Sequence, residues 1–321
     1  MAPKFKKPKL KAALTKLQTT HEQRKRATEL RDRKEAELEN RPNKIAKAEQ
    51  KQQHQQQRQQ QQQKQSTATT NSKKRLPPSP FSEKDSVLLI GEANFSFAKS
   101  LILHVLHRGD QVVATTLDRE EVMQEKYGDG DDHVREVQEA GATVLFGVDG
   151  TKLDECKALK GKRFSKIVFN FPHAGAGIKD QDRNVLSNQK LLQAFFESAA
   201  SFLTDPELGD KKPGEILVTI KTGNPYDLWN IKRLAVGTGL LGNKTSFPFH
   251  TELYPGYEHR RTIGFKDGVS QAGNAEIVSK KPKTYVFVKR SVKEEDMAKE
   301  AEVADIKKRK RAGEDVSDDE D

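Results

Sequence analysis

The central part of the chain alternates short apolar runs with segments of helical spacing. Runs of bulky or branched residues, typical of buried strands, occur at 87–90, 111–117, 142–148, 166–171, 215–221, 245–249 and 284–289. Helical segments are expected between them, at 97–107, 119–140, 153–159, 188–203 and 227–241. This alternation predicts an α/β domain with a mostly parallel, seven-stranded sheet and helices on both of its faces.

The two ends of the chain differ from this central part in charge and composition. Residues 1–80 carry a net charge of +14 and include a glutamine tract at 52–63, whereas residues 293–321 carry −5. The centre is almost neutral at +1, of a total of +10. Such polar, charged segments cannot bury enough apolar surface to fold alone. We therefore predict a basic, Gln-rich, mostly disordered arm at 1–80, a folded domain at 81–292 and a charged disordered tail at 293–321.

The basic arm favours a polyanionic partner. Each phosphate that a lysine or arginine neutralises releases counterions, which favours association without reading sequence. RNA or DNA is thus the predicted partner class, and a solvated arm that only aids solubility is the alternative. The run 307–311 (Lys-Lys-Arg-Lys-Arg) is typical of nuclear import signals. Together, these segments favour a location in the nucleus and nucleolus.

Several classes of protein do not fit the sequence. No apolar run approaches the ~20 residues of a membrane span, so we expect no membrane partner. Cys156 is the only cysteine, which excludes an intrachain disulfide and cysteine-rich metal sites. The eight histidines are scattered, and we predict no metal site.

The transition from strand to helix at 86–98 predicts a ligand-binding loop. The apolar run ends at Gly91, which lets the chain turn sharply and approach a bound molecule closely, while the N–H groups that start the next helix face its polar end. A plain strand-to-helix turn is the alternative. A single glycine falls short of the G-x-G-x-x-G expected of a dinucleotide-dependent oxidoreductase.

Two acidic residues follow successive strands. Asp118 ends the second strand, 27 residues after Gly91, where a carboxylate can hold two ribose hydroxyls. Asp149 ends the third strand and would lie beside an adenine ring. Either one alone is also a common helix N-cap. Their joint placement favours a nucleotide-type cofactor.

The fourth strand runs into Asn170, Phe171, Pro172 and His173. A proline after an aromatic residue stiffens the loop and presents the asparagine amide toward the reactive end of the cofactor. Enzymes that methylate nitrogens of planar bases often carry an Asn/Asp-Pro-Pro-aromatic loop here, and this loop is similar to it. Phe171 is predicted to stack on a flipped base, and His173 to accept or relay a proton. A rigid turn is the alternative.

Two later segments combine basic and aromatic residues. Lys221 follows the fifth strand and is placed to meet a phosphate. In the next helical segment Trp229 is expected in the core. The segment 254–262 combines two tyrosines with His259, Arg260 and Arg261, and we predict that it contacts RNA. A surface loop with incidental charge is the alternative for this segment. The predicted RNA contacts are Lys221, Tyr254, Tyr257, His259, Arg260 and Arg261.

Five segments in this order resemble one known family. They lie at 91–97 (Gly-Glu-Ala-Asn-Phe-Ser-Phe), 116–118, 147–153, 169–175 and 254–262. They are similar to the large-subunit rRNA uridine-N3 methyltransferases, and most of all to the fungal BMT5-like enzymes; the resemblance covers roughly residues 84–290. It implies a Rossmann-like class I methyltransferase domain. The family loop usually reads Gly-Glu-Gly, and alanine replaces the second glycine in this chain, which is compatible with a negative φ.

The resemblance implies S-adenosylmethionine as cofactor, with Asp118 at the ribose and Asp149 at the adenine. The implied reaction methylates N3 of a uridine in large-subunit rRNA, free or in a pre-ribosomal particle, with His173 as the candidate proton acceptor. A non-catalytic ribosome-assembly factor that keeps the fold as an RNA-binding scaffold is the alternative, and we expect a monomer. The methionine end would be held by Gly91, Glu92, Ala93, Asn94, Phe95, Ser96 and Phe97.

Overall fold

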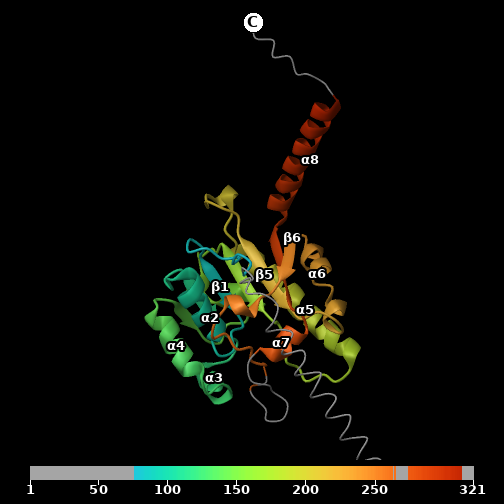
Figure 1. Cartoon of the computed structure of the whole chain (residues 1–321). Coiled ribbons are helices and arrows are strands. Elements are labelled where there is room, and N and C mark those ends of the chain that lie inside the picture. Colours follow the sequence, from blue (N-terminus) through green and yellow to red (C-terminus); the bar gives the residue numbers. More distant parts are fainter. Residues whose placement is uncertain (1–75, 263, 265–273, 313–321) are drawn as a thin grey trace, which may run out of the picture. The chain divides into compact units, whose positions relative to one another are not determined.

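The expected strands form one seven-stranded sheet (Figure 1). The computed structural model describes residues 76–262, 264 and 274–312. The strand order is β3-β2-β1-β4-β5-β7-β6. β7 pairs antiparallel with both β5 and β6, and the other four strand pairs of this sheet are parallel, so the predicted mostly parallel sheet is confirmed. The strands are β1 (Val87–Ile90), β2 (Val112–Thr115), β3 (Thr143–Leu145), β4 (Lys166–Asn170), β5 (Glu215–Ile220), β6 (Leu241–Pro248) and β7 (Lys283–Lys289).

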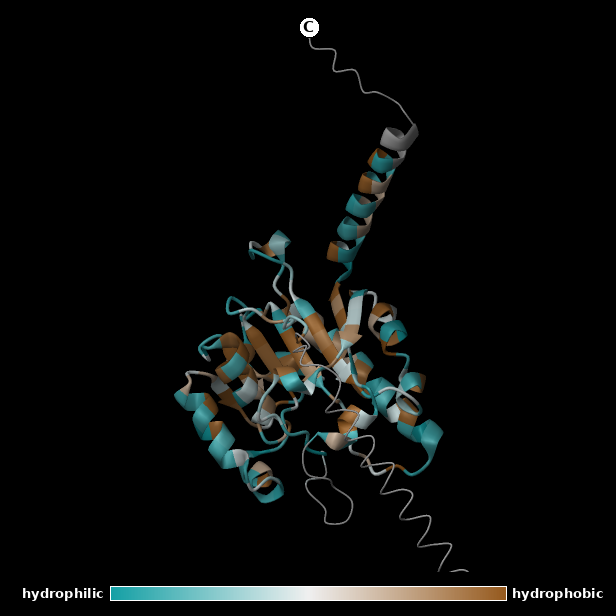
Figure 2. Ribbon diagram, viewed as in Figure 1, coloured by the Kyte–Doolittle hydropathy of each residue, from teal (hydrophilic) through white to brown (hydrophobic). Residues whose placement is uncertain are grey.

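Helices cover both faces of this sheet, as predicted. In β1, Val87 and Leu89 belong to one apolar core, whereas Leu88 and Ile90 belong to another on the opposite face. Figure 2 shows apolar strands at the centre and polar helix surfaces outside. The helices are α2 (Ser96–Leu101), α3 (Glu120–Lys126), α4 (Gly130–Glu139), α5 (Gln181–Ala199), α6 (Ile231–Gly237), α7 (Ala275–Ser279) and α8 (Arg290–Ala312).

Some helices are more divided than the apolar spacing predicts. The segment 119–140 forms α3 and α4, because Tyr127 leaves the helical conformation (φ −134°) and buries its ring. Its hydroxyl donates to the carbonyl oxygen of Arg261 at 2.9 Å. In 227–241 the break lies at Asn230, which has a left-handed φ of 51°. Long-range contacts and local backbone geometry thus interrupt otherwise continuous patterns.

Other segments also differ in form from the expected helices. Segment 97–107 continues after α2 as a π-helical turn at 102–106, and 153–159 forms two 3₁₀ turns. Helix α5 begins at Gln181, earlier than expected, because the side chain of Asp180 caps it by accepting the Arg183 N–H at 2.9 Å.

The tail 293–321, which we expected to be disordered, is helical as far as residue 312, where α8 ends. Ion pairs four residues apart support this exposed helix: Arg290 contacts Glu294 at 2.8 Å and Lys299 contacts Glu295 at 3.6 Å. Residues 1–75 and 313–321 lie outside the described residues, so the predictions for the arm and the end of the tail remain predictions. Across the described ranges, no helix is both long and apolar enough to span a membrane.

The sheet topology places the candidate site. Strands β1, β2, β4 and β5 end at the same edge because they run parallel. The order of strands along the chain reverses between β1 and β4. In open α/β sheets, ligands bind outside the carboxyl ends of the strands at such a reversal. The predicted cofactor loop and the Asn170–His173 loop both leave from this point.

Candidate active site

The loop after β1 turns at a position that only glycine fits. Gly91 has φ +68°, and a Cβ atom there would lie 2.7 Å from the ring of Phe169. Ala93 has a φ outside the left-handed region, so the alanine that departs from the family pattern is compatible with this backbone. The N–H of Glu92 donates to the carbonyl oxygen of Thr115 at 2.8 Å, which joins the loop to β2.

A cavity of about 150 Å³ lies at the end of β1 and is called the cofactor cavity here. Phe95 is the one predicted cofactor residue that does not line it. Its ring is buried in the core, 5.9 Å from the ring of Phe146, which corrects its assignment. The predicted residues that do line the cavity are Gly91, Glu92, Ala93, Asn94, Ser96, Phe97, Asp118 and Asp149.

Glu92 is a buried carboxyl group in this cavity, with 8% of the residue exposed. Its Oε2 accepts the N–H of Ala98 in the first turn of α2, at 3.3 Å. Burial raises the pKa of Glu92 to about 7, and that hydrogen bond lowers it by less. A cationic ligand beside Glu92 would favour its ionised form.

Asp118 and Asp149 both line the cofactor cavity but have different partners. Both oxygens of Asp118 accept from Nζ of Lys126, at 2.7 and 2.9 Å, and the side chain caps no helix. Oδ1 of Asp149 accepts from the N–H and the hydroxyl of Thr151, at 2.8 and 2.7 Å. Asp149 therefore stabilises a turn while also facing the cavity, but it is not the helix N-cap that was the alternative, because the next helical turn has Lys152 at that position.

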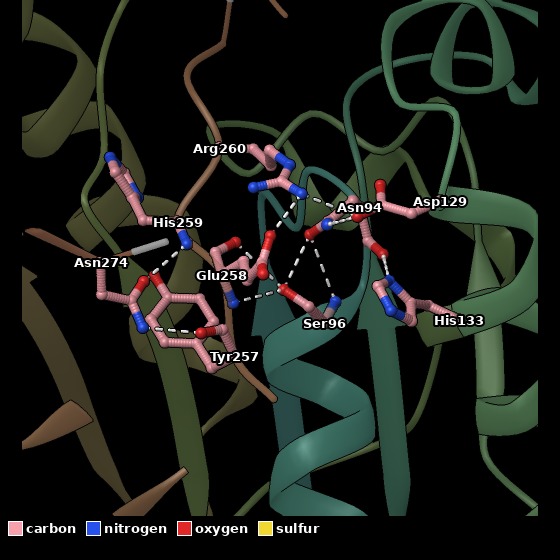
Figure 3. Close-up of polar contacts among 9 residues, drawn as sticks. All are labelled: Asn94, Ser96, Asp129, His133, Tyr257, Glu258, His259, Arg260 and Asn274. Carbon is pink, nitrogen blue, oxygen red and sulfur yellow. Dashed lines mark hydrogen bonds and ion pairs between the residues drawn. The ribbon is translucent and has the colours of Figure 1, made fainter. Parts of the chain in front are cut away.

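The cofactor loop is joined to segment 257–260 by a polar network (Figure 3). Oδ1 of Asn94 accepts from the hydroxyl of Ser96 at 2.8 Å. The same hydroxyl is 3.1 Å from both the carbonyl oxygen and the N–H of Glu258. Asn94 is 2% exposed and Ser96 is 1% exposed, so these bonds form away from solvent. The two segments are 162 residues apart in the chain.

Arg260 extends this network to the start of α4. Its Nη2 contacts Asp129 at 2.8 Å and Glu258 at 2.6 Å, and Asn94 Nδ2 also donates to Asp129, at 3.0 Å. Nδ1 of His133, in α4, donates to the backbone carbonyl of Asn94 at 2.8 Å. Three separate parts of the chain thus hold the wall of the cofactor cavity.

The loop after β4 separates the cofactor cavity from a second one. Asn170 lines the cofactor cavity, and its Nδ2 is buried with no hydrogen-bond partner among the described residues. Phe171 takes a left-handed φ of 52°, and its ring packs against His259 with 4.7 Å between centroids. Pro172 is buried. The loop is thus rigid and leaves one amide available to a ligand.

His173 lines both cavities. Its Nδ1 accepts the N–H of Gly175 at 2.9 Å, so in the neutral ring the hydrogen lies on Nε2. Partial burial and the charge of Lys221 lower the pKa of His173. A neutral His173 held in this way presents Nε2–H to the site as a hydrogen-bond donor, and its role as proton acceptor stays a prediction.

The second cavity, called the base cavity here, measures about 400 Å³. Aromatic rings of Phe171, Tyr226 and Trp229 line it, together with Lys221 and other charged groups. Trp229 is 2% exposed and belongs to the core, as expected. The residues that line both cavities are Phe171, His173, His259, Arg260 and Thr262.

The predicted basic RNA contacts line the base cavity but are paired with carboxylates. Nζ of Lys221 is 2.7 Å from Oε1 of Glu276, and the Arg261 guanidinium contacts Oε2 of the same residue at 3.0 Å. Arg260 is held by Asp129 and Glu258, as described above. These cations are therefore fixed parts of the site.

The two tyrosines predicted as RNA contacts do not reach the surface. Tyr254 is 3% and Tyr257 is 8% exposed. Their rings pack against Phe97 of α2, with centroids 4.8 and 5.4 Å away. This packing corrects their assignment as RNA contacts. Both rings are part of the apolar packing beside the cofactor loop and are not free to stack on a base.

Sequence reasoning missed three carboxylates, Glu276, Glu258 and Asp129, that hold the site together. Glu276 and Asp129 pair with cations from distant parts of the chain, whereas Glu258 pairs with Arg260, two residues away. It also missed Asn274, whose Oδ1 accepts the N–H of His259 at 2.8 Å and whose Nδ2 donates to Tyr257 O at 2.6 Å. In the described part of the chain, no cluster of three or more residues could hold a metal ion.

The residues of the cofactor cavity fit S-adenosylmethionine. The unmet hydrogen bond of the buried Asn170 amide can be satisfied by a polar ligand, and Glu92 offers a carboxyl group to a cationic methionine end. Asp118 and Asp149 lie at successive strand ends, as a nucleoside requires. The sheet and cavity are those of a Rossmann-like methyltransferase, and S-adenosylmethionine is the cofactor of this class.

Comparison of the sequence with models of protein families identifies the family of this chain. The family model described as rRNA (uridine-N3-)-methyltransferase BTM5-like matches residues 88–261. The chain belongs to this BMT5-like family. It is 34% identical to the uncharacterized protein At4g26485 of Arabidopsis thaliana over 187 residues, which cover 57% of this chain and 85% of that protein.

Two further comparisons found similar proteins. It is 28% identical over 238 residues to the 25S rRNA (uridine(2634)-N(3))-methyltransferase of Saccharomyces cerevisiae, covering 60% of this chain and 70% of the yeast protein. A solved structure of Aeropyrum pernix fibrillarin with bound S-adenosyl-L-methionine has a TM-score of 0.34 and 13% identity, and covers 66% of this chain and 70% of fibrillarin. The family assignment rests on the sequence matches.

Proposed function

We propose that this rRNA methyltransferase acts on N3 of a uridine in large-subunit rRNA. The observation that carries the proposal is the base cavity, which adjoins the cofactor cavity and shares Phe171 and His173 with it. Its aromatic lining suits a planar base. The similarity to the yeast 25S rRNA enzyme supports this choice of base and nitrogen.

The residues at the junction have defined tasks in this proposal. N3 lies on the Watson–Crick edge, so the base must be unpaired or flipped before it enters the cavity. S-Adenosylmethionine, when bound, supplies a methyl group on an electrophilic sulfonium, so no protein nucleophile is required. Phe171 stacks on the base, while the Asn170 amide and Nε2–H of His173 donate hydrogen bonds that orient the imide.

The proposal is tested by nucleoside analysis of rRNA. Mass spectrometry of large-subunit rRNA from cells with and without the gene should show loss of N3-methyluridine when the gene is absent. Re-expression of the full chain should restore it. Unchanged N3-methyluridine in the deleted strain would contradict the proposal and favour a scaffold without catalysis.

The role of His173 is tested in the purified full chain. His173→Ala should retain cofactor binding, measured by calorimetry, and lose most of its methyl transfer to rRNA. His104→Ala is the matched control because His104 is exposed and lines neither cavity. Full turnover in His173→Ala would remove this residue from the site.

We further propose that the protein works in the nucleolus. The basic residues of 1–80 and the run 307–311 support this. Deleting both segments from a fluorescently tagged chain should redistribute it to the cytoplasm. An unchanged nucleolar signal after deletion would contradict the proposal.

A further inference from the structure

One part of the base cavity holds two cations against one carboxylate: Lys221 and Arg261 share Glu276, whereas Arg260 is already paired with Asp129 and Glu258. The cations that line it are Lys221, Arg260 and Arg261, whereas Glu276 is the only carboxylate among its described lining residues. The two oxygens of Glu276 are divided between Lys221 and Arg261, at 2.7 and 3.0 Å. Lys221 is only 9% exposed, so solvent screens its charge weakly.

The positive field already acts on the two imidazoles of the cavity. Burial, and then the charge of Lys221, lowers the pKa of His259 to about 4; Arg261 and Arg260 lower it further, whereas Glu276 raises it. The pKa of His173, in the loop after β4, is lowered by burial and by the charge of Lys221. Burial disfavours any ion at this place, whereas the positive charge of Lys221, which disfavours a protonated imidazole, favours the anion of an imide.

Neither of these two imidazoles is suited to act as a strong proton acceptor. His173 presents Nε2–H because Gly175 occupies its Nδ1. Within the described residues, the ring of His259 has no hydrogen-bond partner, but a pKa of about 4 makes it a weak base. Glu276 is held as a carboxylate, because Lys221 and Arg261 outweigh its burial and lower its pKa. Tyr226, from the 3₁₀ turn at 226–229, completes the titratable lining.

We propose that the base cavity binds the target uridine as its N3-deprotonated anion, stabilised by Lys221 and Arg261, and that Glu276 sets the strength of this stabilisation. The inference rests on the proposed function. The N3 proton goes to solvent, and the electron pair left on N3 forms the bond to the methyl carbon. The electron pair of the broken carbon–sulfur bond remains on sulfur. A neutral His259 accepts no proton in this scheme, and its ring lies directly against that of Phe171, with 4.7 Å between the centroids.

The test is the pH dependence of methyl transfer by the full chain to unmodified large-subunit rRNA under single-turnover conditions. The rate should rise with pH to a plateau as the bound imide ionises. Lys221→Met removes a positive charge and should raise the midpoint by about one pH unit, whereas Glu276→Gln removes the opposing charge and should lower it by about one unit. Glu121→Gln, on the exposed side of α3, should leave the midpoint unchanged.

A substrate variant identifies the group that titrates. RNA transcribed with 5-fluorouridine has a more acidic N3–H, because fluorine withdraws electrons from the ring. The midpoint should therefore fall for this RNA with the wild-type chain. A midpoint that is the same for both RNAs would assign the titration to a protein group and overturn the inference.

The remaining outcomes are also decisive. Cofactor binding by calorimetry shows that each variant is folded. If both folded variants move the midpoint in the same direction, or neither moves it, the inference fails while the proposed function stands. If the wild-type chain transfers no methyl group to uridine at any pH, the proposed function fails as well.

Discussion

The cofactor cavity and the base cavity share a wall but are built in different ways. The loop of the cofactor cavity is held by the buried neutral groups of Asn94 and Ser96, and the ion pairs of Arg260 support it from outside. The base cavity is held by ion pairs around Glu276. The first thus depends more on hydrogen bonds between neutral groups, whereas the second depends more on a balance of charge. Substitutions in the two cavities should therefore affect different measured quantities.

The largest expected effect lies at the boundary between them. Asn170→Ala removes the unpartnered buried amide, and we expect kcat to fall by about 10²–10³-fold, as for other preorganised donors. Cofactor affinity should change far less. Asn243→Ala is the control, because its amide oxygen is also buried without a partner but lies in β6, outside both cavities. Equal loss of activity in both variants would indicate a general packing effect.

The next effect concerns Glu92 in the cofactor cavity and the free energy of unfolding. The folded-state pKa of Glu92 is raised from 4.5 to about 7, so the folded state binds its proton more tightly. Stability therefore falls as pH rises between these values, and the full cost, about 3 kcal/mol, applies above pH 7. Glu92→Gln should remove most of this cost in denaturant unfolding at pH 8.5, with little difference at pH 4.

The same variant should weaken cofactor binding. A cationic methionine end favours ionised Glu92, so cofactor affinity of the wild-type chain should rise with pH through about 7. In Glu92→Gln this pH dependence should disappear in calorimetric titrations. Parallel pH profiles for the two proteins would show that Glu92 does not face the cofactor's charge.

A smaller effect is expected at the ribose position. Asp118→Ala should weaken cofactor binding by about 10–100-fold through loss of charged hydrogen bonds, with little change in stability. Asp149→Ala should also lower stability by about 1 kcal/mol, because Asp149 caps the turn at Thr151. Unchanged cofactor affinity in Asp118→Ala would place the ribose elsewhere.

The smallest effect tests the partner of Asp118. The Lys126–Asp118 pair is 29% and 21% exposed, so Lys126→Met should change the free energy of unfolding by under about 1 kcal/mol. Because it frees both oxygens of Asp118, cofactor affinity should rise a few-fold. A clear loss of affinity would show instead that Lys126 itself contacts the cofactor.

The sequence predicts the cofactor cavity better than the base cavity for a physical reason. Gly91, Asp118 and Asp149 each follow a strand, so local pattern and topology suffice to place them. Lys221 and Glu276 are 55 residues apart, and Arg260 and Asp129 are 131 residues apart. Such ion pairs arise only in the tertiary fold and leave no local signal.

The errors in the sequence predictions have a related cause. Tyr254 and Tyr257 lie beside a basic segment, and nothing local shows that both rings turn into the core against Phe97. Phe95 belongs to the motif that forms the cofactor loop, yet its own ring packs on Phe146. Membership of a motif places the backbone of a residue, whereas long-range packing decides the direction of its side chain.

The hydroxyl of Ser96 bonds to both backbone groups of Glu258, and so it joins the loop that holds one substrate to the segment that borders the other. If binding orders one segment, this contact is a direct route by which the other is affected. Thermodynamic linkage makes such coupling reciprocal: if RNA tightens the binding of the methyl donor by some factor, the donor tightens the binding of RNA by the same factor. Positive coupling of this kind would favour the ternary complex over either half-loaded state.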